Sequence, residues 1–329
     1  MAVDTDAVGD TPLVELDVGV DPTVYGKVEW FNFATLPNGG GSVKTRIGVA
    51  MLDAAEAVGE LDPGQSLVEA SSGNTGAALA RVGGARGYDV EIVMPDDAGV
   101  GKVDAIRAAD GDIRFVDSEE GYDAFVSACQ RLVDAGAGYY PNQYENPANP
   151  GVHAGTTGPE IWRQTGGNVT HFVAGAGTGG TVAGVSYALA GRGVEIHGFT
   201  PVSDGHDIDG LKFLSGPDTY VPGTFDPTAL DTSTVVSTAT AREHARRLRR
   251  RHAGTELRIR DTGRWSTSLV RDELRIDDEF LVGPSSGACA ALVRRLDADG
   301  RFGDDDVVVM PLPDRGDRYP ERDLWAEYL

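Results

Sequence analysis

Short apolar runs alternate with amphipathic stretches along most of this chain. Runs of four to five apolar residues that end at turn residues predict strands, and apolar residues spaced three or four apart predict helices. In the first half, the predicted strands are Leu67–Ala70, Val90–Met94 and Ile113–Val116, and the predicted helices are Val43–Val58, Thr75–Gly83, Val103–Ala109 and Tyr122–Ala135. This alternation predicts an α/β fold whose parallel strands are covered by helices.

A second series of the same kind follows the segment Pro141–Pro150, which carries too many Pro and Asn residues for regular structure. Its predicted strands are His171–Ala174, Glu195–Phe199 and Asp306–Met310, and its predicted helices are Thr181–Leu189 and 285–296. We therefore expect two lobes, 1–150 and 151–329, with an active site in the cleft between them. Within the first lobe, residues 1–40 are the segment that can pack on the second lobe instead.

Composition narrows the class of partner. The 329 residues include 51 acidic and 29 basic side chains, a net charge of −22 that repels nucleic acids and anionic membranes. With four lysines in the chain, this balance favours a halophilic protein kept soluble in high salt. The acidic N-terminus and the lack of an eighteen-residue apolar run predict a soluble, cytoplasmic protein. Cys129 and Cys289 stand far apart, which favours core packing and suggests neither a disulfide nor a metal site.

Two glycine-containing segments are candidates for anion binding. Gly175–Thr181 spells G-x-G-x-x-G after an apolar run and before a predicted helix, where free N–H groups bind phosphate esters. A nicotinamide-binding protein would also use Glu195 for the ribose, whereas the hydroxyls of Thr178 and Thr181 suit a phosphate monoester. The segment Ser71–Gly76 also joins a strand to a helix and predicts a second anion site on the other lobe.

Lys44 is the third candidate. It stands at the start of the predicted helix Val43–Val58, where a cation opposes the helix dipole and has a lowered pKa. A lysine with a lowered pKa is suited to forming a Schiff base.

Six motifs in order resemble the cysteine synthases, pyridoxal-phosphate (PLP) enzymes with the tryptophan-synthase-β fold (fold type II). They are TPLVEL at Thr11, GSVKTR at Gly41, SSGNTG at Ser71, NPANPGVHAGTTGPEIW at Asn146, GAGTGGT at Gly175 and GPSSGA at Gly283. They span nearly the whole chain, which makes the resemblance specific. It implies a two-lobed enzyme that binds PLP and forms a homodimer.

The resemblance assigns cofactor-binding roles by position. Lys44 matches the lysine that forms the Schiff base with PLP, Asn74 the residue that bonds the ring hydroxyl, and Ser285 the serine that faces the pyridine nitrogen. The phosphate-binding loop matches Gly177, Thr178, Gly179, Gly180 and Thr181. A hydroxyl facing the ring nitrogen leaves it largely unprotonated, which suits β-elimination better than transamination.

The resemblance also assigns the substrate site. The loop that clasps the substrate carboxylate matches Ser71, Ser72, Asn74 and Thr75, joined by Gln143. The implied reaction is β-replacement: Lys44 removes the α-proton, the β-substituent leaves, and a sulfur nucleophile adds. Closure of the loop on the substrate would exclude water.

The C-terminal region resembles the B-type or O-phosphoserine-using cysteine synthases, through the segment from Ile208 and the motif LPDRGDRY at Leu312. Some of those enzymes bind an anionic substrate group with an arginine where this chain has Lys212, so we expect Lys212 to hold the phosphate of O-phosphoserine. The chain departs from the family pattern at His252–Asp278, an insertion without a clear hydrophobic period. A hairpin is expected at Asp261–Gly263. The insertion would cover the active-site mouth, contact a second subunit or form a surface loop. His153 and His171 are interpreted as structural.

The leading function is synthesis of L-cysteine from O-acetylserine or O-phosphoserine and a sulfide donor. Homocysteine as the nucleophile would give cystathionine, and an amine would give diaminopropionate. Serine or threonine dehydratase fits the SSGNTG loop and Ser285 less well. A nicotinamide-binding Rossmann protein leaves Lys44 without a role, and retention of Lys44 argues against an inactive paralogue.

Overall fold

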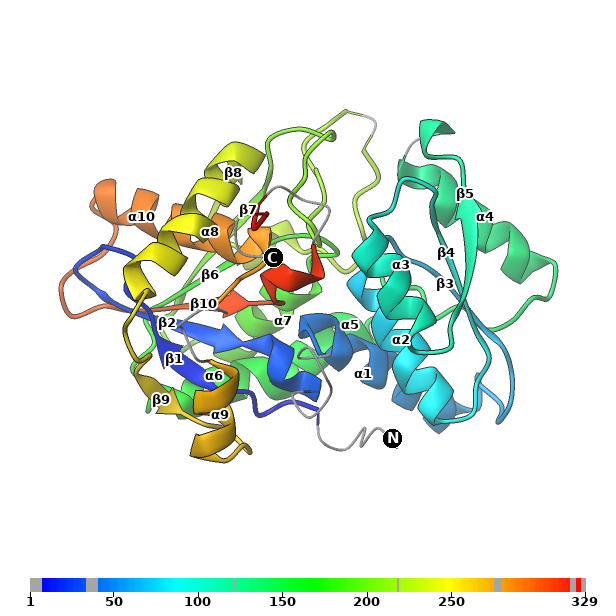
Figure 1. Cartoon of the computed structure of the whole chain (residues 1–329), viewed down its shortest axis with the longest axis horizontal. Helices are drawn as coiled ribbons and strands as arrows, with labels where there is room; N and C mark the ends of the chain where they lie inside the picture. Colours follow the sequence, from blue (N-terminus) through cyan, green and yellow to red (C-terminus); the bar gives the residue numbers. More distant parts are fainter. Residues whose placement is uncertain are drawn as a thin grey trace.

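The computed structural model describes residues 8–33, 41–120, 122–217, 219–274, 280–319 and 324–326. Two β-sheets lie side by side, each covered by helices (Figure 1). Over the described residues, the larger sheet has seven strands in the order β8-β7-β6-β10-β2-β1-β9, and the smaller has three in the order β3-β4-β5. The predicted α/β class is confirmed.

The large sheet combines both ends of the chain. Strands β8, β7, β6, β10 and β2 run parallel to one another, while β1 pairs antiparallel with both β2 and β9 at one edge. The bounds are β1 Leu13–Glu15, β2 Thr23–Val28, β6 His171–Gly175, β7 Glu195–Pro201, β8 Thr232–Val236, β9 Ile259–Asp261 and β10 Val307–Leu312. Strands from the first 28 residues thus belong to a sheet that is otherwise built by the second half of the chain.

The small sheet is fully parallel and packs helices on both faces. Its side chains alternate: Ile92 and Met94 pack in the core with α1, α2 and α3, while Val93 packs with Phe125 and Cys129 of α4. Figure 1 shows α4 on the far side of this sheet from α2 and α3. The bounds are β3 Leu67–Ala70, β4 Val90–Pro95, β5 Asp112–Val116, α1 Val43–Val58, α2 Asn74–Ala85, α3 Val100–Arg107 and α4 Tyr122–Asp134.

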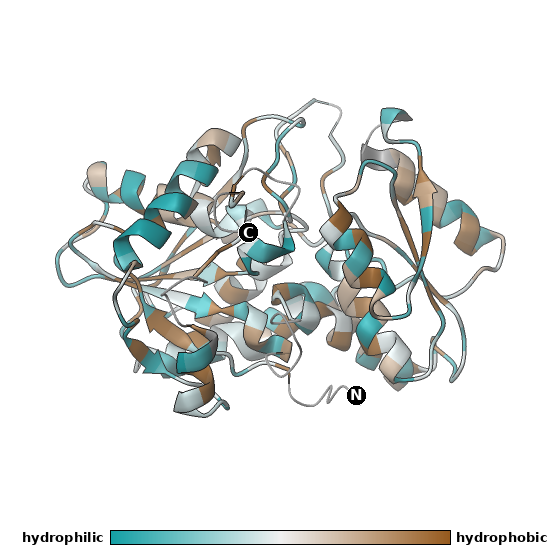
Figure 2. Cartoon of the chain, viewed as in Figure 1, coloured by the Kyte–Doolittle hydropathy of each residue, from teal (hydrophilic) through white to brown (hydrophobic). Residues whose placement is uncertain are grey.

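The inner strands β6 and β10 of the large sheet are buried on both faces in the same way. Val308 and Met310 pack in the core with α8 and α10, whereas Val309 packs on the opposite face with α7 and α6. In Figure 2, α8 is largely hydrophilic, as expected for a helix with one solvent-facing side. The remaining helical elements are α5 Ala148–Val152, the π-helix η4 His153–Thr157, α6 Gly158–Gln164, α7 Gly180–Leu189, α8 Thr238–His252, α9 Thr267–Glu273, α10 Pro284–Ala298 and the 3₁₀ turns η2 Glu29–Phe33, η3 Ser118–Glu120, η5 Pro227–Ala229 and η6 Gly316–Arg318.

Two local predictions need correction. The irregular segment expected at Pro141–Pro150 is wrong at its end, because α5 begins at Ala148, whose N–H is capped by the side chain of Asn146 (2.9 Å). The hairpin expected at Asp261–Gly263 is also wrong, because β9 pairs with the distant strand β1 instead of a local partner. In the described part of the insertion, residues 252–274, Val270 and Leu274 pack in the large core; residues 275–279 lie outside the described residues.

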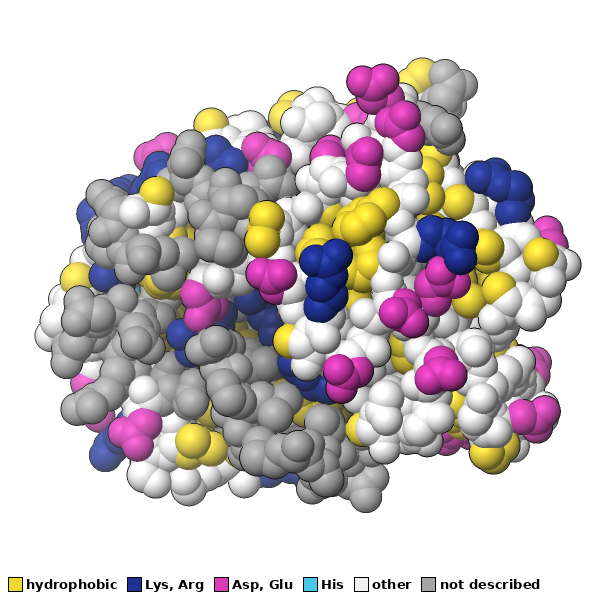
Figure 3. Space-filling view, turned by 45° about the vertical axis from the view of Figure 1, so that its right-hand side comes forward, with side chains coloured by type: hydrophobic (Ala, Val, Ile, Leu, Met, Phe, Trp, Pro, Cys, Tyr) yellow, Lys and Arg dark blue, Asp and Glu magenta, His cyan; other side chains and the backbone are white. Residues whose placement is uncertain are grey.

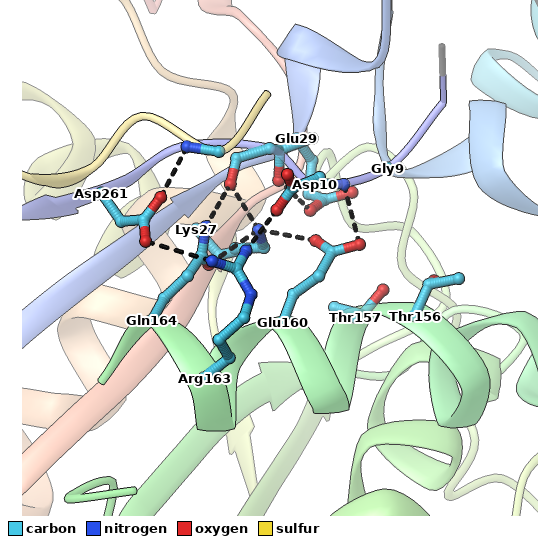
Figure 4. A network of polar contacts seen from close by, with 12 residues as sticks. Gly9, Asp10, Lys27, Glu29, Thr156, Thr157, Glu160, Arg163, Gln164 and Asp261 are labelled. Carbon is cyan, nitrogen blue, oxygen red and sulfur yellow. Dashed lines mark hydrogen bonds and ion pairs between the residues drawn. The ribbon is translucent and has the colours of Figure 1, made fainter. Parts of the chain in front are cut away.

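A buried network of charged side chains joins β2, α1 and α6 (Figure 4). Lys27 Nζ lies 2.7 Å from Glu160, and Arg46 lies 2.7 Å from both Glu160 and Glu29. Burial raises the pKa of Glu160, but Arg46 and Lys27 outweigh it and hold that pKa well below its usual range. The network fixes the first turns of α1, and Lys44 lies two residues before Arg46.

Acidic side chains are distributed over the surface, as the net negative charge of the chain leads one to expect. On the face turned forward in Figure 3, Asp and Glu side chains are spread over the surface and do not form a single patch. Within the described residues, no helix combines the length and apolar character that crossing a membrane requires.

Candidate active site

Lys44 lies in the first turn of α1, which begins in a capping box. The Ser42 hydroxyl accepts from Lys44 N (3.2 Å), and the Thr45 hydroxyl accepts from Ser42 N (3.2 Å). In the described part of the chain, Lys44 Nζ has no hydrogen-bond or ion-pair partner. Burial lowers the pKa of Lys44 to about 8, and the charge of Asp314 opposes this shift. The direction agrees with the expectation from the helix dipole, but the cause is burial, and a pKa near 8 makes a fraction of the amine neutral at neutral pH.

The glycine-rich loop follows β6 and opens α7. A Cβ on Gly177 would lie 2.1 Å from the carbonyl oxygen of Gly210, and one on Gly180 would lie 1.9 Å from Asn149 Oδ1, so neither position accepts a larger residue. Gly179 has a φ of +84°, which favours glycine. The N–H groups of residues 177–179 donate to no acceptor among the described residues. These free donors at a helix N-terminus suit an anion.

Both threonines of this loop are contacted by buried side chains of the preceding helical segment. Asn149 donates to the Thr178 hydroxyl (2.9 Å), and the Thr181 hydroxyl lies 3.2 Å from His153 Nε2. His153 Nδ1 lies 2.9 Å from the Thr157 hydroxyl, and burial is the main reason that the pKa of this histidine falls well below its usual value. The interpretation of His153 as structural is consistent with this buried position beneath the loop.

The Ser71–Thr75 loop lies across the cleft on the other lobe. The buried Ser71 hydroxyl accepts from the N–H groups of Gly73 (3.2 Å) and Gly76 (2.9 Å), which shapes the turn. Thr75 donates to Gln143 Oε1 (2.7 Å), and Gln143 Nε2 donates to the carbonyl of Ala70 (3.0 Å). The Ser72 hydroxyl makes no hydrogen bond with a described residue and lines the cleft.

Ser285 and Asp314 close the site from the second lobe. Ser285, in the first turn of α10, is 4% exposed, and its hydroxyl bonds to no described residue. Asp314 accepts from Asn74 Nδ2 (2.6 Å) and from the Tyr319 hydroxyl, and burial raises its pKa to about 6. Asn74 also accepts from Arg318 (2.9 Å) through Oδ1, so this side chain is fully engaged in the absence of a ligand.

These residues surround two adjoining hollows of about 510 and 570 Å³, open solvent at the mouth included. The hollows share Lys44, Asn74, Gly177, Thr178, Asp209, Gly210 and Leu211. The first is also lined by the Ser71–Thr75 loop, Gln143, Lys102 and Lys212; the second also by Gly179, Thr181 and Ser285. The sequence-predicted residues therefore meet in one cleft, except that Gly180 of the same loop lines neither hollow. Among the described residues of the insertion, none lines either hollow, so the expected cover over the mouth is not seen there.

Comparison with known proteins decides the family. Residues 5–314 match the family described as pyridoxal-phosphate dependent enzyme. The chain belongs to that family. The site fits this cofactor: an unpaired amine, a free serine hydroxyl and a set of free N–H groups without room for a Cβ line the same space. The enzyme therefore uses PLP.

Relatives within the PLP-dependent family cover nearly all of the chain. Cysteine synthase B of Escherichia coli (strain K12) is 34% identical over 325 residues, which are 97% of this chain and 95% of the relative. The crystal structure of O-ureido-L-serine synthase has a TM-score of 0.80 at 32% identity, covering 98% of this chain and 94% of that one. The structure of an O-acetylserine dependent cystathionine β-synthase from Helicobacter pylori has a TM-score of 0.79 at 27% identity, covering 98% and 97%. The tryptophan-synthase-β-like fold is thereby confirmed.

Sequence reasoning missed several residues of this PLP enzyme's cleft. Lys102 of α3 forms an ion pair with Asp209 of the opposite lobe, and its Nζ lies 5.9 Å from the Tyr319 ring centroid. Glu69 lies fully buried behind Gln143, whose N–H it accepts at 3.4 Å, and burial raises its pKa to about 8. For Tyr319 and Asp314, the signal was present in the motif LPDRGDRY; for Lys102 there was none, because its partner is 107 positions away.

Proposed function

We propose that this enzyme synthesises L-cysteine by PLP-dependent β-replacement, from O-acetylserine or O-phosphoserine and a sulfide donor. The observation that carries the proposal is the meeting of Lys44, Ser285, the Gly177–Thr181 loop and the Ser71–Thr75 loop in one cleft. A cofactor site and a carboxylate site that share Lys44 and Asn74 suit an amino acid that reacts directly above the cofactor.

In this proposal, the residues of the second hollow hold the cofactor. The free N–H groups and hydroxyls of Gly177–Thr181 bind the phosphate, and Ser285 donates to the pyridine nitrogen. Asn74 bonds the ring hydroxyl, which requires its Nδ2 to leave either Asp314 or Tyr319. Bound PLP supplies electron withdrawal from the substrate α-carbon. Lys44 carries the cofactor in the resting enzyme and then moves the α-proton.

The first hollow binds the substrate. The Ser71–Thr75 loop and Gln143 hold the carboxylate, and Ser72 has a hydroxyl available for it. The hydrogen bond between Thr75 and Gln143 joins the loop to the segment Pro141–Pro150. Buried Glu69 accepts a hydrogen bond from the N–H of Gln143 and so helps to fix that segment. Substrate binding and loop closure over the cleft would exclude water from the reacting carbon.

We further propose that Lys212 binds the leaving group of O-phosphoserine. Its side chain is 5% exposed and lines the first hollow, with Nζ 5.6 Å from the centroid of the Tyr220 ring. Lys102 reaches the same hollow from the other lobe. A cation inside this space favours a phosphate ester over an uncharged acetyl ester. The same C-terminal features underlie our assignment of the chain to the B-type or O-phosphoserine-using group.

One alternative within the same chemistry deserves a parallel test. The fold neighbours include enzymes named for cystathionine and for O-ureido-L-serine synthesis, so homocysteine or a nitrogen- or oxygen-containing nucleophile is a second candidate in place of sulfide. The position and charge of the first hollow bear on which serine ester binds. They do not determine which nucleophile adds.

We also propose that the enzyme is a cytoplasmic homodimer adapted to high salt. The family resemblance motivates the dimer, and the net charge of −22 motivates the salt dependence. Light scattering would measure the dimer, and urea unfolding at low and multimolar salt would measure the adaptation. Equal stability in dilute buffer would refute the halophilic part alone.

Product analysis tests the central activity. The holoenzyme is supplied with O-acetylserine or O-phosphoserine together with sulfide, homocysteine or ammonia, and the amino-acid products are identified by mass spectrometry. We expect cysteine from the sulfide reaction at a rate at least ten times that of the other nucleophiles. Faster cystathionine formation would favour the alternative, and pyruvate as the main product would indicate a dehydratase.

A further inference from the structure

Two histidines and a glutamate gather at the end of the large sheet that lies away from the cleft. His171 begins β6, Glu195 begins β7 in register with it, and His197 follows two residues later on the same face. The cleft lies at the carboxyl ends of these strands, so the length of β6, about 13 Å, separates this cluster from the glycine-rich loop. A role in the PLP reaction is therefore excluded by distance.

The ring nitrogens of the two histidines form an ordered series. His171 Nε2 faces Asp306 Oδ2 (3.3 Å), and His197 Nδ1 faces the Thr232 hydroxyl (2.7 Å). The two remaining nitrogens, His171 Nδ1 and His197 Nε2, are hydrogen-bonded to each other at 3.0 Å, and a metal ion bound between them would replace that bond. Because a carboxylate only accepts, a neutral His171 donates from Nε2 and presents a lone pair at Nδ1. If His197 donates from Nδ1 to the Thr232 hydroxyl, its Nε2 lone pair points into the same space.

This arrangement matches what a metal ion requires from histidine. Metal-binding histidines commonly donate their second N–H to a carboxylate or another oxygen, which fixes the ring and makes the free nitrogen more basic. Asp306 and Thr232 occupy those outer positions here. Both rings are buried, and their neighbouring nitrogens turn toward the space that the Glu195 carboxylate also reaches.

The third donor is a carboxylate at the solvent side. Glu195 Oε2 lies 3.8 Å from His197 Nε2, and one ligand atom from each of the three residues lies within 4.8 Å of the others. Two ligands of a tetrahedral zinc ion are about 3.3 Å apart, given bonds of about 2.0–2.1 Å, so small side-chain rotations suffice. Both histidines are buried, while the Glu195 side chain is 49% exposed, which leaves a path for an ion and for water.

The surrounding charges are mixed. Asp306 and Asp231 favour a cation near the rings, and Arg301 opposes it. Phe302 covers the His171 ring, with centroids 4.7 Å apart, so one side of the cluster is apolar. A partly dry site with carboxylates in its outer shell favours a divalent cation.

We propose that His171, His197 and Glu195 bind a divalent transition-metal ion of the zinc class, with water completing the coordination. The ion would join the first residues of β6 and β7 and stabilise the large sheet, independently of the PLP reaction. This extends the structural role expected for His171. Spacing along the chain does not predict this site, because its histidines lie 26 positions apart on adjacent parallel strands.

Equilibrium dialysis of the holoenzyme tests this site. The protein is freed of metal with a chelator, titrated with Zn²⁺ or Co²⁺, and analysed for bound metal. We expect one equivalent per chain, an increase in Tm on binding, and an unchanged visible spectrum of the cofactor. Co²⁺ should also give the absorption of a tetrahedral or five-coordinate site.

Three variants make the test specific. Glu195→Gln, at an exposed position that leaves folding intact, should weaken binding about tenfold, and His197→Gln should weaken it at least a hundredfold. The matched control is His244→Gln on α8, which should bind as the wild type does. Absence of stoichiometric binding by the wild type, or equal binding by Glu195→Gln and the wild type, would overturn the proposal.

Discussion

Two lysines near the start of the chain have completely different surroundings: Lys27 is fully buried, whereas Lys44 is partly exposed in the cleft. Lys27 Nζ contacts Glu160 (2.7 Å), the carbonyl of Thr11 (2.5 Å) and Gln164 (3.0 Å). Lys44 Nζ, on helix α1, makes no hydrogen bond or ion pair with a described residue, and Lys44 lines both hollows of the cleft. The fold thus gives partners to the charged groups that hold α1 in place, and it leaves the Lys44 amine in the cleft without a polar partner among the described residues.

The same contrast extends to the other groups of the two regions. Glu29, Arg46 and Glu160 have partners for their buried polar atoms, whereas Asp314 Oδ1 and Asn149 Oδ1, beside the cleft, have none in the described part of the chain. Buried polar groups without partners cost free energy. Such atoms also occur in residues that line neither hollow, among them Trp30, Arg247 and Trp265, so those at Asp314 and Asn149 support the ligand site without locating it by themselves.

The largest effect is expected from Lys44→Ala. This variant should lower kcat/KM for β-replacement by about 10³-fold or more, because the amine that carries the cofactor and moves the proton is lost. Its free energy of unfolding without cofactor should change by less than about 1 kcal/mol, since Lys44 has no partner to leave behind. Steady-state kinetics and urea unfolding measure the two quantities. A variant that retained a tenth of the activity would contradict the assignment.

For Lys27→Met we expect a large loss of stability with cofactor binding retained. Removing one member of the buried network should cost about 3 kcal/mol of stability, because Glu160 is left without one of its two cations. The folded fraction should still bind the cofactor. Arg114→Met is the matched control: Arg114 pairs with Glu91 at 2.8 Å on the surface, and its loss should cost less than about 1 kcal/mol. Equal losses of unfolding free energy in the two variants would show that the buried pair and the surface pair do not differ in their contribution to stability.

A smaller effect is expected for Lys212→Ala. If Lys212 binds the phosphate of O-phosphoserine, the ratio of kcat/KM for O-phosphoserine to that for O-acetylserine should fall about tenfold, the value of one charge-assisted contact. The rate with O-acetylserine serves as the internal control. An unchanged ratio would reject Lys212 as the determinant of the ester preference.

The smallest predicted change is a shift on the pH axis. Lys44 must be neutral to capture PLP, and burial lowers its pKa to about 8, so the capture rate of the cofactor-free protein should rise with pH and reach half its maximum near pH 8. Asp314→Asn should move this midpoint to lower pH, because the Asp314 charge raises the pKa of Lys44. Stopped-flow absorbance measures the rate. A midpoint near 10.5 would show that the amine is fully solvated.

Much of this contrast was predictable from local sequence. The bounds of α1 follow from its apolar spacing, and Ser42 and Thr45 supply the cap that places Lys44 in the first turn. The glycine-rich loop and the Ser71–Thr75 loop each join a strand to the next helix, so their geometry is determined within a few residues. Ordered motifs then bring together residues that spacing alone would leave unrelated.

The parts that sequence did not predict depend on contacts between distant segments. Strand β9 pairs with β1 across more than 240 positions, so its pairing left no local signal and suggested a hairpin instead. Short strands such as β1 have too few residues to show a period. The pair of Lys102 and Asp209 and the rings of His171 and His197 likewise depend on how elements pack after the chain has folded.

The most direct test of the central claim is to locate the cofactor on the chain. The purified holoenzyme is treated with borohydride, which reduces a Schiff base to a stable amine, and the peptides are mapped by mass spectrometry. The four lysines lie far apart in the sequence and are easily distinguished. We predict a phosphopyridoxyl group on Lys44, lost when substrate is added before reduction. A label on Lys27, Lys102 or Lys212, or no label in a protein that is yellow, would contradict the account.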